Sequence, residues 1–197
     1  GLASMRDDNA ELDLNGVIDF NGKTPRFDLL ADVRKVNLKN LKLTKDSLEF
    51  KGNLNFNFTS NSLENFLGNA RVTNAELLKN GRRIPFDSLI LSSYYENDVK
   101  VLSALSNEFK ATVKGDFSIN DLPNAFTLLL SNYYPAYIKT PVRRPRNQSI
   151  SFDIETFYAD EYIQLLDSSL AGFNNSRIVG DLNLNTNEMN LTADIPQ

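Results

Sequence analysis

The sequence predicts a mainly β protein: a curled antiparallel β-sheet with two short helical inserts. The first observation is strict alternation of apolar and polar residues, as in FKGNLNFNF, residues 50–58, which marks a strand with one apolar face. The second is that such stretches recur at intervals of about ten residues, which is typical of all-β folds. The third is a glycine on the apolar side of several of them, where glycine marks a bend, a bulge or a close approach of another backbone. A taco-like trough and a β-sandwich both fit these observations.

The predicted strands follow the alternating segments in chain order. They are Glu11–Phe20, Arg26–Leu38, Leu48–Thr59, Gly68–Leu78, Pro85–Ser93, Val99–Ala104, Glu108–Ile119, Ser149–Phe157, Ser176–Leu184 and Glu188–Asp194. Between Gly68–Leu78 and Pro85–Ser93, the pair Asn80-Gly81 is a strong signal of a two-residue hairpin loop. The first residues, GLASM, lie outside these segments.

Two segments depart from the alternation and predict helices. Residues 121–138 begin with Asp121 as an N-cap and Pro123 in the first turn, and their apolar positions fit a helix better than a strand. Residues 160–171 begin with Asp160 as a cap and stop at Gly172, since glycine favours a helix end. Residues 139–148 contain two prolines and three arginines and are expected to form an extended linker.

The predicted elements divide the chain into successive regions. A β-repeat region covers residues 10–120, the helical insert and the linker follow, and a second β-region with its own helix covers residues 149–197. We interpret residues 1–197 as a single fragment of a larger repeat protein.

The composition excludes several classes of function. The chain has 197 residues, of which 41% are hydrophobic and 23% charged, as in a globular protein that buries a sizeable core. Its net charge of −4 argues against nucleic-acid binding. It has no Cys and no His, so it has no thiol or histidine catalysis and no thiolate or imidazole metal ligand. No apolar run exceeds three residues, so no transmembrane segment is predicted. We therefore expect no enzyme, no metal and no cofactor.

One short pattern occurs four times, as LNGVIDF, FKGNLNF, VKGDFSI and IVGDLNL. Each copy places a glycine in the apolar register, and recurrence inside alternating runs suggests one supersecondary unit that is used repeatedly. A broad sheet that curls needs such points, so the four glycines are predicted to be backbone bends. They are Gly16, Gly52, Gly115 and Gly180.

Three stretches make the sequence resemble the TamB/AsmA family of Gram-negative envelope proteins. The first is FKGNLNFNF followed by LGNARVTNAELLKNGRRIPFDSLILSS, the second is VLSALSNEFKATVKGDFSINDLPNAF, and the third is IVGDLNLNTNEMNLTADIP. The resemblance covers roughly residues 11–195 and rests on pattern and rhythm. The two helical inserts depart from a plain repeat.

The resemblance implies a fold, a place and a function. Family members are anchored in the inner membrane, cross the periplasm as a taco-like β-trough, and are implicated in phospholipid transport to the outer membrane and in outer-membrane assembly. This chain would then be a periplasmic section that carries phospholipid, with outer-membrane assembly proteins as partners of the whole protein. The alternative is a structural or adhesive β-module with a closed core that binds a protein partner.

An apolar groove for acyl chains would be lined by the apolar side of the repeat strands, because hydrocarbon needs a surface without charge or unsatisfied polar groups. The predicted lining residues are Leu14, Ile18, Phe20, Phe50, Leu54, Phe56, Phe58, Phe109, Val113, Phe117, Ile119, Ile178, Leu182 and Leu184. The same residues can instead close an ordinary β-sandwich core. Asp116 and Asp181 follow two of the glycines and are expected to point outward into solvent. The helix at residues 121–138 can lie across the groove as a lid.

Overall fold

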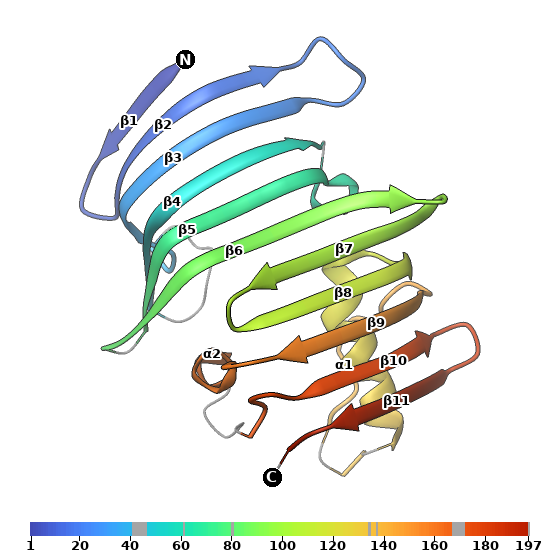
Figure 1. Ribbon diagram of the computed structural model, residues 1–197. Coiled ribbons are helices and arrows are strands. Elements are labelled where there is room, and N and C mark those ends of the chain that lie inside the picture. Colours follow the sequence, from blue (N-terminus) through green and yellow to red (C-terminus); the bar gives the residue numbers. More distant parts are fainter. Residues whose placement is uncertain are drawn as a thin grey trace.

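Eleven strands form one antiparallel sheet in the computed structural model, and each strand pairs with its neighbours in sequence (Figure 1). The structure describes residues 1–40, 47–60, 62–79, 81–133, 135–136, 138–166 and 172–196. The mainly β prediction is confirmed. Of the two architectures that the sequence left open, the strands form a single open sheet rather than the two packed sheets of a sandwich.

The elements follow one another as a meander with two inserts. The strands are β1 Leu2–Arg6, β2 Ala10–Asp19, β3 Arg26–Asn37, β4 Leu48–Thr59, β5 Leu67–Lys79, β6 Arg82–Glu96, β7 Val99–Ser106, β8 Phe109–Asp116, β9 Ser149–Thr156, β10 Arg177–Asn183 and β11 Glu188–Asp194. The helices are the 3₁₀ turns η1 Leu63–Asn65 and η2 Ile119–Asp121, and the α-helices α1 Leu122–Tyr133 and α2 Asp160–Leu166.

The strands differ from the prediction by more than two residues in three places, one of which is β6, Arg82–Glu96, which extends three residues beyond the predicted Pro85–Ser93 at each end. Residues 2–6, which carry no alternation, form β1 at the edge of the sheet and pair with β2. The strand predicted to reach Ile119 ends at Asp116, because residues 119–121 turn into η2. The predicted hairpin is present, since Lys79 pairs with Arg82 across two residues; residue 80 itself lies outside the described residues.

The two predicted helices are present, and α1 is shorter than predicted. α1 ends at Tyr133 rather than at residue 138, because Pro135 has no amide hydrogen and cannot continue a helix. α2 is described to Leu166, and predicted positions 167–171 lie outside the described residues. Neither helix in the described part of the chain has the length and apolarity needed to cross a membrane.

The strands β2–β5 bend where their pairing shifts. Three neighbouring strand pairs contain a register shift, next to Leu12, between Val33 and Val36, and between Lys51 and Asn53. An extra residue in one strand bends it and increases its twist, and Figure 1 shows the strands curving at this level. A small cluster of buried residues lies there, formed by Ala10, Ala31, Val33 and Val36 with Leu12, Leu14, Leu38, Phe50 and Leu54 packed against it.

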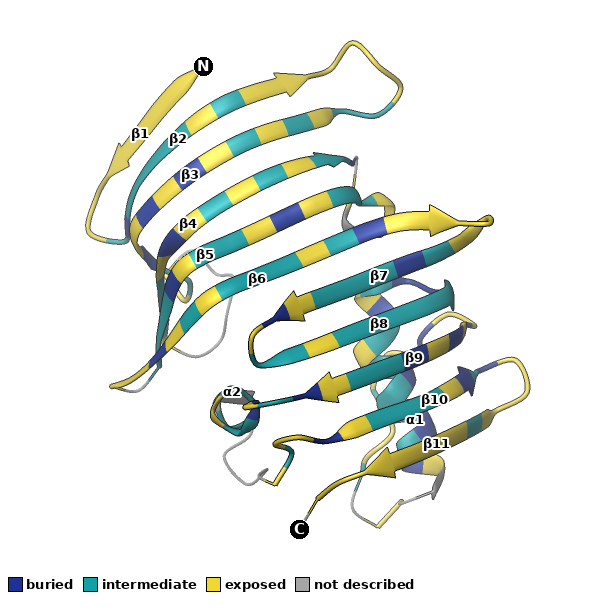
Figure 2. Cartoon of the chain, viewed as in Figure 1, coloured by how far each residue is buried: buried dark blue, intermediate teal, exposed yellow. Residues whose placement is uncertain are grey.

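A larger core lies under α1, which Figure 1 shows behind strands β7–β11. Its buried members are Phe117, Ala125, Leu129, Ile150, Phe152, Leu182 and Leu184. Figure 2 shows the contrast with the other end of the sheet, where β1 is exposed along its whole length. The sheet therefore has one thoroughly packed end and one that is mostly open.

Candidate functional site

One row of paired residues crosses the sheet from β2 to β11 without a polar side chain. Directly paired residues of antiparallel strands lie on the same face, so the register connects them into a continuous line, here called the apolar row. Its members are Gly16, Leu29, Phe56, Ala70, Leu91, Ala104, Ala111, Ile154, Ile178 and Ala193.

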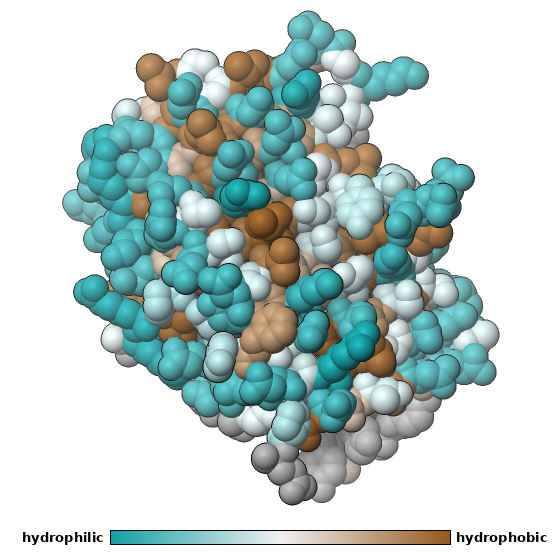
Figure 3. All heavy atoms as spheres, in the orientation of Figure 1, coloured by the Kyte–Doolittle hydropathy of each residue, from teal (hydrophilic) through white to brown (hydrophobic). Residues whose placement is uncertain are grey.

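The next row, one residue further along each strand, lies on the opposite face and is almost entirely polar. It consists of Val17, Asp28, Asn57, Asn69, Ser92, Ser103, Thr112, Asp153, Val179 and Thr192. Figure 3 views the molecule from the side away from α1, where hydrophilic residues predominate and several separate hydrophobic patches lie among them. The alternation predicted from the sequence thus separates an apolar face, which carries α1, from a wetter one.

The apolar face over β2–β6, here called the open half, is partly accessible to solvent. Ile18 is 44% exposed and Leu91 is 36% exposed, while Leu29, Leu54 and Phe56 are half-buried. The open half is therefore a surface rather than an enclosed cavity.

Four phenylalanines gather on the open half. The ring centroid of Phe58 lies 4.8 Å from that of Phe27, 6.1 Å from that of Phe56 and 5.1 Å from that of Phe66. Phe56 and Phe58 were predicted to line the groove, but Phe27 and Phe66 were not. The alternation of β3 could have identified Phe27, which pairs with Phe58; Phe66 lies outside any strand, so no periodic signal identifies it.

The apolar face over β8–β10, here called the covered half, packs against α1. Ala125 and Leu129 of the helix are completely buried. The ring of Phe126 meets that of Phe152 edge-on, with 5.2 Å between their centroids. In this half the sheet and the helix form a closed core of the kind that the alternative prediction described.

The predicted groove residues are divided between the two halves. The open half holds Leu14, Ile18, Phe50, Leu54, Phe56 and Phe58. The covered half holds Val113, Phe117, Ile119, Ile178, Leu182 and Leu184, all of them members of the core under α1 or packed against it. Phe109 is half-buried at the start of β8, and Phe20 follows the end of β2 and is 70% exposed.

At three of the four repeat glycines the neighbouring backbone approaches closely, since a Cβ atom at Gly16 or Gly115 would lie 2.1 or 2.2 Å from a carbonyl oxygen of the adjacent strand, much as at Gly180. Gly52 lies at a register shift with φ +149°, beside Ala75. Gly16 and Gly115 pair in regular register. Gly180 leaves room for a neighbour, since a Cβ atom there would lie 2.8 Å from the ring of Phe152 and 2.3 Å from the carbonyl oxygen of residue 190. Of the four, Gly52 thus coincides with the bend of the strands.

A carboxylate from the open half holds the segment that leads into α1. Glu64, in η1 between β4 and β5, accepts hydrogen bonds from the Ser118 hydroxyl at 2.8 Å and from the amides of Ile119 and Asn120, each at 3.0 Å. Burial raises the pKa of Glu64, but the hydrogen bonds outweigh it and the pKa is lowered. A carboxylate suits this place because the first amides of a helical turn have no partner within the helix.

Lys100 lies next to this carboxylate. Its ammonium donates to the backbone oxygen of Glu64 at 2.5 Å and lies 5.1 Å from the centre of the Phe117 ring. Burial lowers the pKa of Lys100, although Glu64 opposes the shift. Sequence reasoning missed both residues, because their partners are far away along the chain.

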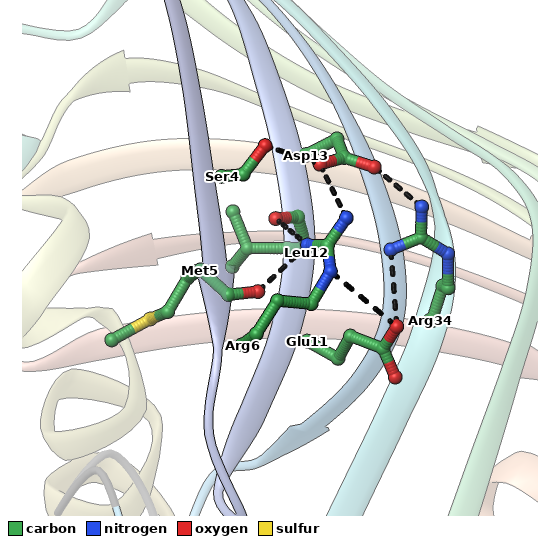
Figure 4. Close-up of polar contacts among 7 residues, drawn as sticks. All are labelled: Ser4, Met5, Arg6, Glu11, Leu12, Asp13 and Arg34. Atoms are coloured by element: carbon green, nitrogen blue, oxygen red, sulfur yellow. Dashed lines mark hydrogen bonds and ion pairs between the residues drawn. The ribbon is translucent and has the colours of Figure 1, made fainter.

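On the opposite face, an ion-pair network joins the edge strand β1 to β2 and β3 (Figure 4). Asp13 accepts from Ser4 at 2.6 Å, from Arg6 at 2.7 Å and from Arg34. Glu11 also pairs with Arg34, at 3.2 Å. The hydrogen bonds from Ser4, Arg6 and Arg34 hold the pKa of Asp13 well below its ordinary value.

The acidic residues that follow the repeat glycines do not converge. The Asp116 side chain is 83% exposed and pairs with Arg146 at 3.3 Å, and Asp181 is also exposed. Among the described residues, no group of three or more acidic side chains is placed to hold a metal ion. A hollow of about 620 Å³ lies over β1–β5, but most of its lining side chains belong to the polar face.

Comparisons with known proteins add no assignment to this geometry. No protein-family model, no curated protein and no solved structure matches the chain. The features of the described residues that bear on function are the apolar face with its two halves and the Glu64 carboxylate, which binds the segment before α1.

Proposed function

We propose that this chain is a non-enzymatic carrier segment that holds the acyl chains of a phospholipid on its apolar face. The observation that carries the proposal is the apolar row, which crosses ten strands without a polar side chain. Hydrocarbon cannot compensate a buried polar group, so an uninterrupted apolar line is what an acyl chain requires.

The open half supplies the accessible part of this surface. Contiguous apolar side chains left in contact with water commonly mark a binding surface, and four phenylalanines gather there. Burial stabilises a hydrocarbon chain by about 0.8 kcal/mol per methylene, so full burial of a sixteen-carbon tail gains on the order of 10 kcal/mol. The loss of motion on binding offsets part of that gain.

The resemblance of the sequence to the TamB/AsmA family supports the nature of the ligand and the location. On this proposal the chain is a periplasmic section of a protein anchored in the inner membrane of a Gram-negative envelope. Phospholipid would pass along the apolar face toward the outer membrane, and outer-membrane assembly proteins would be partners of the whole protein.

Native mass spectrometry with lipid extraction tests the proposal on chain purified in mild buffer. We expect co-purifying phospholipid in the wild type and its loss in Leu91→Gln, which places an amide in the middle of the apolar row. Leu105→Gln is the matched control, because Leu105 is 48% exposed and pairs with Ile90 on the opposite face. No lipid in the wild type, or equal lipid in the two variants, would contradict the proposal.

A second candidate function is a structural module that binds a protein partner. The covered half favours it, because α1 and the sheet already form a closed core there. On this reading the open half packs against protein rather than lipid. A purified chain without lipid, and with a single cooperative unfolding transition, would favour this candidate.

A further inference from the structure

We propose that α1 is a displaceable lid on the covered half and that Glu64 is its latch. Acyl chain and helix would then compete for the same section of the apolar face. The inference rests on the proposed function and adds to it a closed section of the binding surface and a residue that controls access to it.

The first support is that the surface under α1 continues the surface of the open half. The apolar row passes from Leu91 through Ala104 and Ala111 to Ile154 and Ile178 without a break. The last two pack against the core that α1 closes. The helix therefore covers part of one continuous face, not a separate site.

The second support is the chemistry of the helix. The sequence of α1, LPNAFTLLLSNY, contains no charged residue, and its residues from Asn124 to Ser131 are all at least half-buried. A surface helix ordinarily carries a charged outer side. An uncharged helix that is displaced from the sheet can rest with its inner side on an acyl chain, because it brings no charge into contact with the hydrocarbon.

The third support is the latch itself. The Glu64 carboxylate holds Ser118, Ile119 and Asn120, which lie two to four residues before the start of α1. Glu64 lies two residues before Phe66, whose ring packs against Phe58 on the open half. The connection between β4 and β5 therefore contacts the open half through Phe66 and the segment before α1 through Glu64. A ligand that displaces Phe66 would also strain the hydrogen bonds of Glu64.

Hydrogen–deuterium exchange tests the lid in the absence of lipid. In Glu64→Gln we expect the amides of α1 to exchange about tenfold faster, since a charge-assisted hydrogen bond is lost, while those of β9 and β10 stay unchanged. Glu161→Gln is the control, because it removes the same charge from an exposed position of α2. Unchanged exchange in α1, or equal acceleration in α1 and β9, would overturn the lid.

A cross-link separates the lid from the proposed function. The chain has no cysteine, so Glu64→Cys and Ser118→Cys in one variant provide the only two thiols, which a short bifunctional maleimide can join. The probe is cis-parinaric acid, a fluorescent fatty acid. We expect the cross-linked form to bind fewer probe molecules per chain than the same variant left reduced.

Each outcome of the cross-link experiment has a distinct meaning. Equal binding by the cross-linked and reduced forms would overturn the lid and leave the proposed function standing. If the cross-linked form, the reduced form and the wild type all fail to bind the probe, the result counts against the proposed function. It also overturns the proposal that acyl chain and helix compete for one surface. The exchange measurement then decides by itself whether α1 opens.

Discussion

The two halves of the apolar face have the same pattern in sequence but different surroundings in the structure. In the open half, leucines and phenylalanines of β2–β6 remain half-buried or exposed. In the covered half, Ile150, Phe152 and Leu182 of β9 and β10 are buried because α1 lies on them, and the other apolar side chains of this half pack around them. Alternation therefore determines which face is apolar, whereas a separate segment determines whether that face is a core or a surface.

Truncation should cost far more in the covered half. Leu182 is completely buried, and we expect Leu182→Ala to lower the free energy of unfolding by about 2–5 kcal/mol, since it leaves a cavity in a packed core. Leu54→Ala in the open half should cost clearly less, because Leu54 is only half-buried and water can fill the space. Urea unfolding measures both. Equal losses would mean that the open half is as closely packed as the covered one.

A methyl group at Gly180 should strain the covered half. The added Cβ would lie 2.3 Å from a backbone oxygen of β11 and 2.8 Å from the Phe152 ring, and overpacking of this kind costs about 1–3 kcal/mol. Gly22→Ala is the control, since its nearest neighbour atom is 3.4 Å away. Thermal unfolding should show a lower midpoint for Gly180→Ala alone, and a shift of the same size in Gly22→Ala would refute the packing explanation.

Loss of the Asp13 carboxylate should loosen the edge of the open half. In Asp13→Asn we expect faster amide exchange in β1 and no change in β9, because Arg6 and Arg34 lose their shared partner. The pKa of Asp13 is lowered in the folded chain. Its contribution is therefore complete above the unfolded pKa and is lost as the pH falls through the folded one.

The pH dependence provides the control for that variant. The exchange difference between wild type and Asp13→Asn should persist at neutral pH and fade only in strong acid. A difference that disappears near neutrality would point to another titrating group.

The smallest effect is expected for the acids next to the repeat glycines. Asp116→Asn and Asp181→Asn remove exposed carboxylates and should change neither the unfolding midpoint nor the binding of cis-parinaric acid. Fluorescence titration and thermal unfolding check both. A large loss of function in either variant would indicate chemistry at these acids and would argue against a passive apolar carrier.

Local features of the fold could be predicted from the sequence, because period-two patterns and turn residues act within a few positions. β4 and β11 have the bounds that alternation predicts, Leu48–Thr59 and Glu188–Asp194. β1 was missed because LASMR has no alternation; its place is determined by pairing with β2 and by the Asp13 network. Strand existence was therefore predictable wherever one face is consistently apolar.

The candidate site was predictable only in part, because its decisive contacts join distant segments. Glu64 and its partners Ser118, Ile119 and Asn120 are separated by 54–56 residues, and no local pattern connects them. The prediction that Leu54 and Leu182 line one groove placed both on the apolar face, yet α1 buries only Leu182 completely. Where a helix docks depends on tertiary packing, which periodicity does not describe.

The direction of the apolar row has a consequence for anything that moves along it. The row runs across the strands, so each step from one member to the next is one strand spacing of about 4.8 Å. Leucine, alanine and isoleucine at successive steps offer dispersion contacts of similar kind, and none supplies a hydrogen bond that would trap a ligand. A hydrocarbon on the section of this line that α1 leaves uncovered would experience a corrugated track of shallow wells, along which thermal motion alone can produce one-dimensional sliding in either direction.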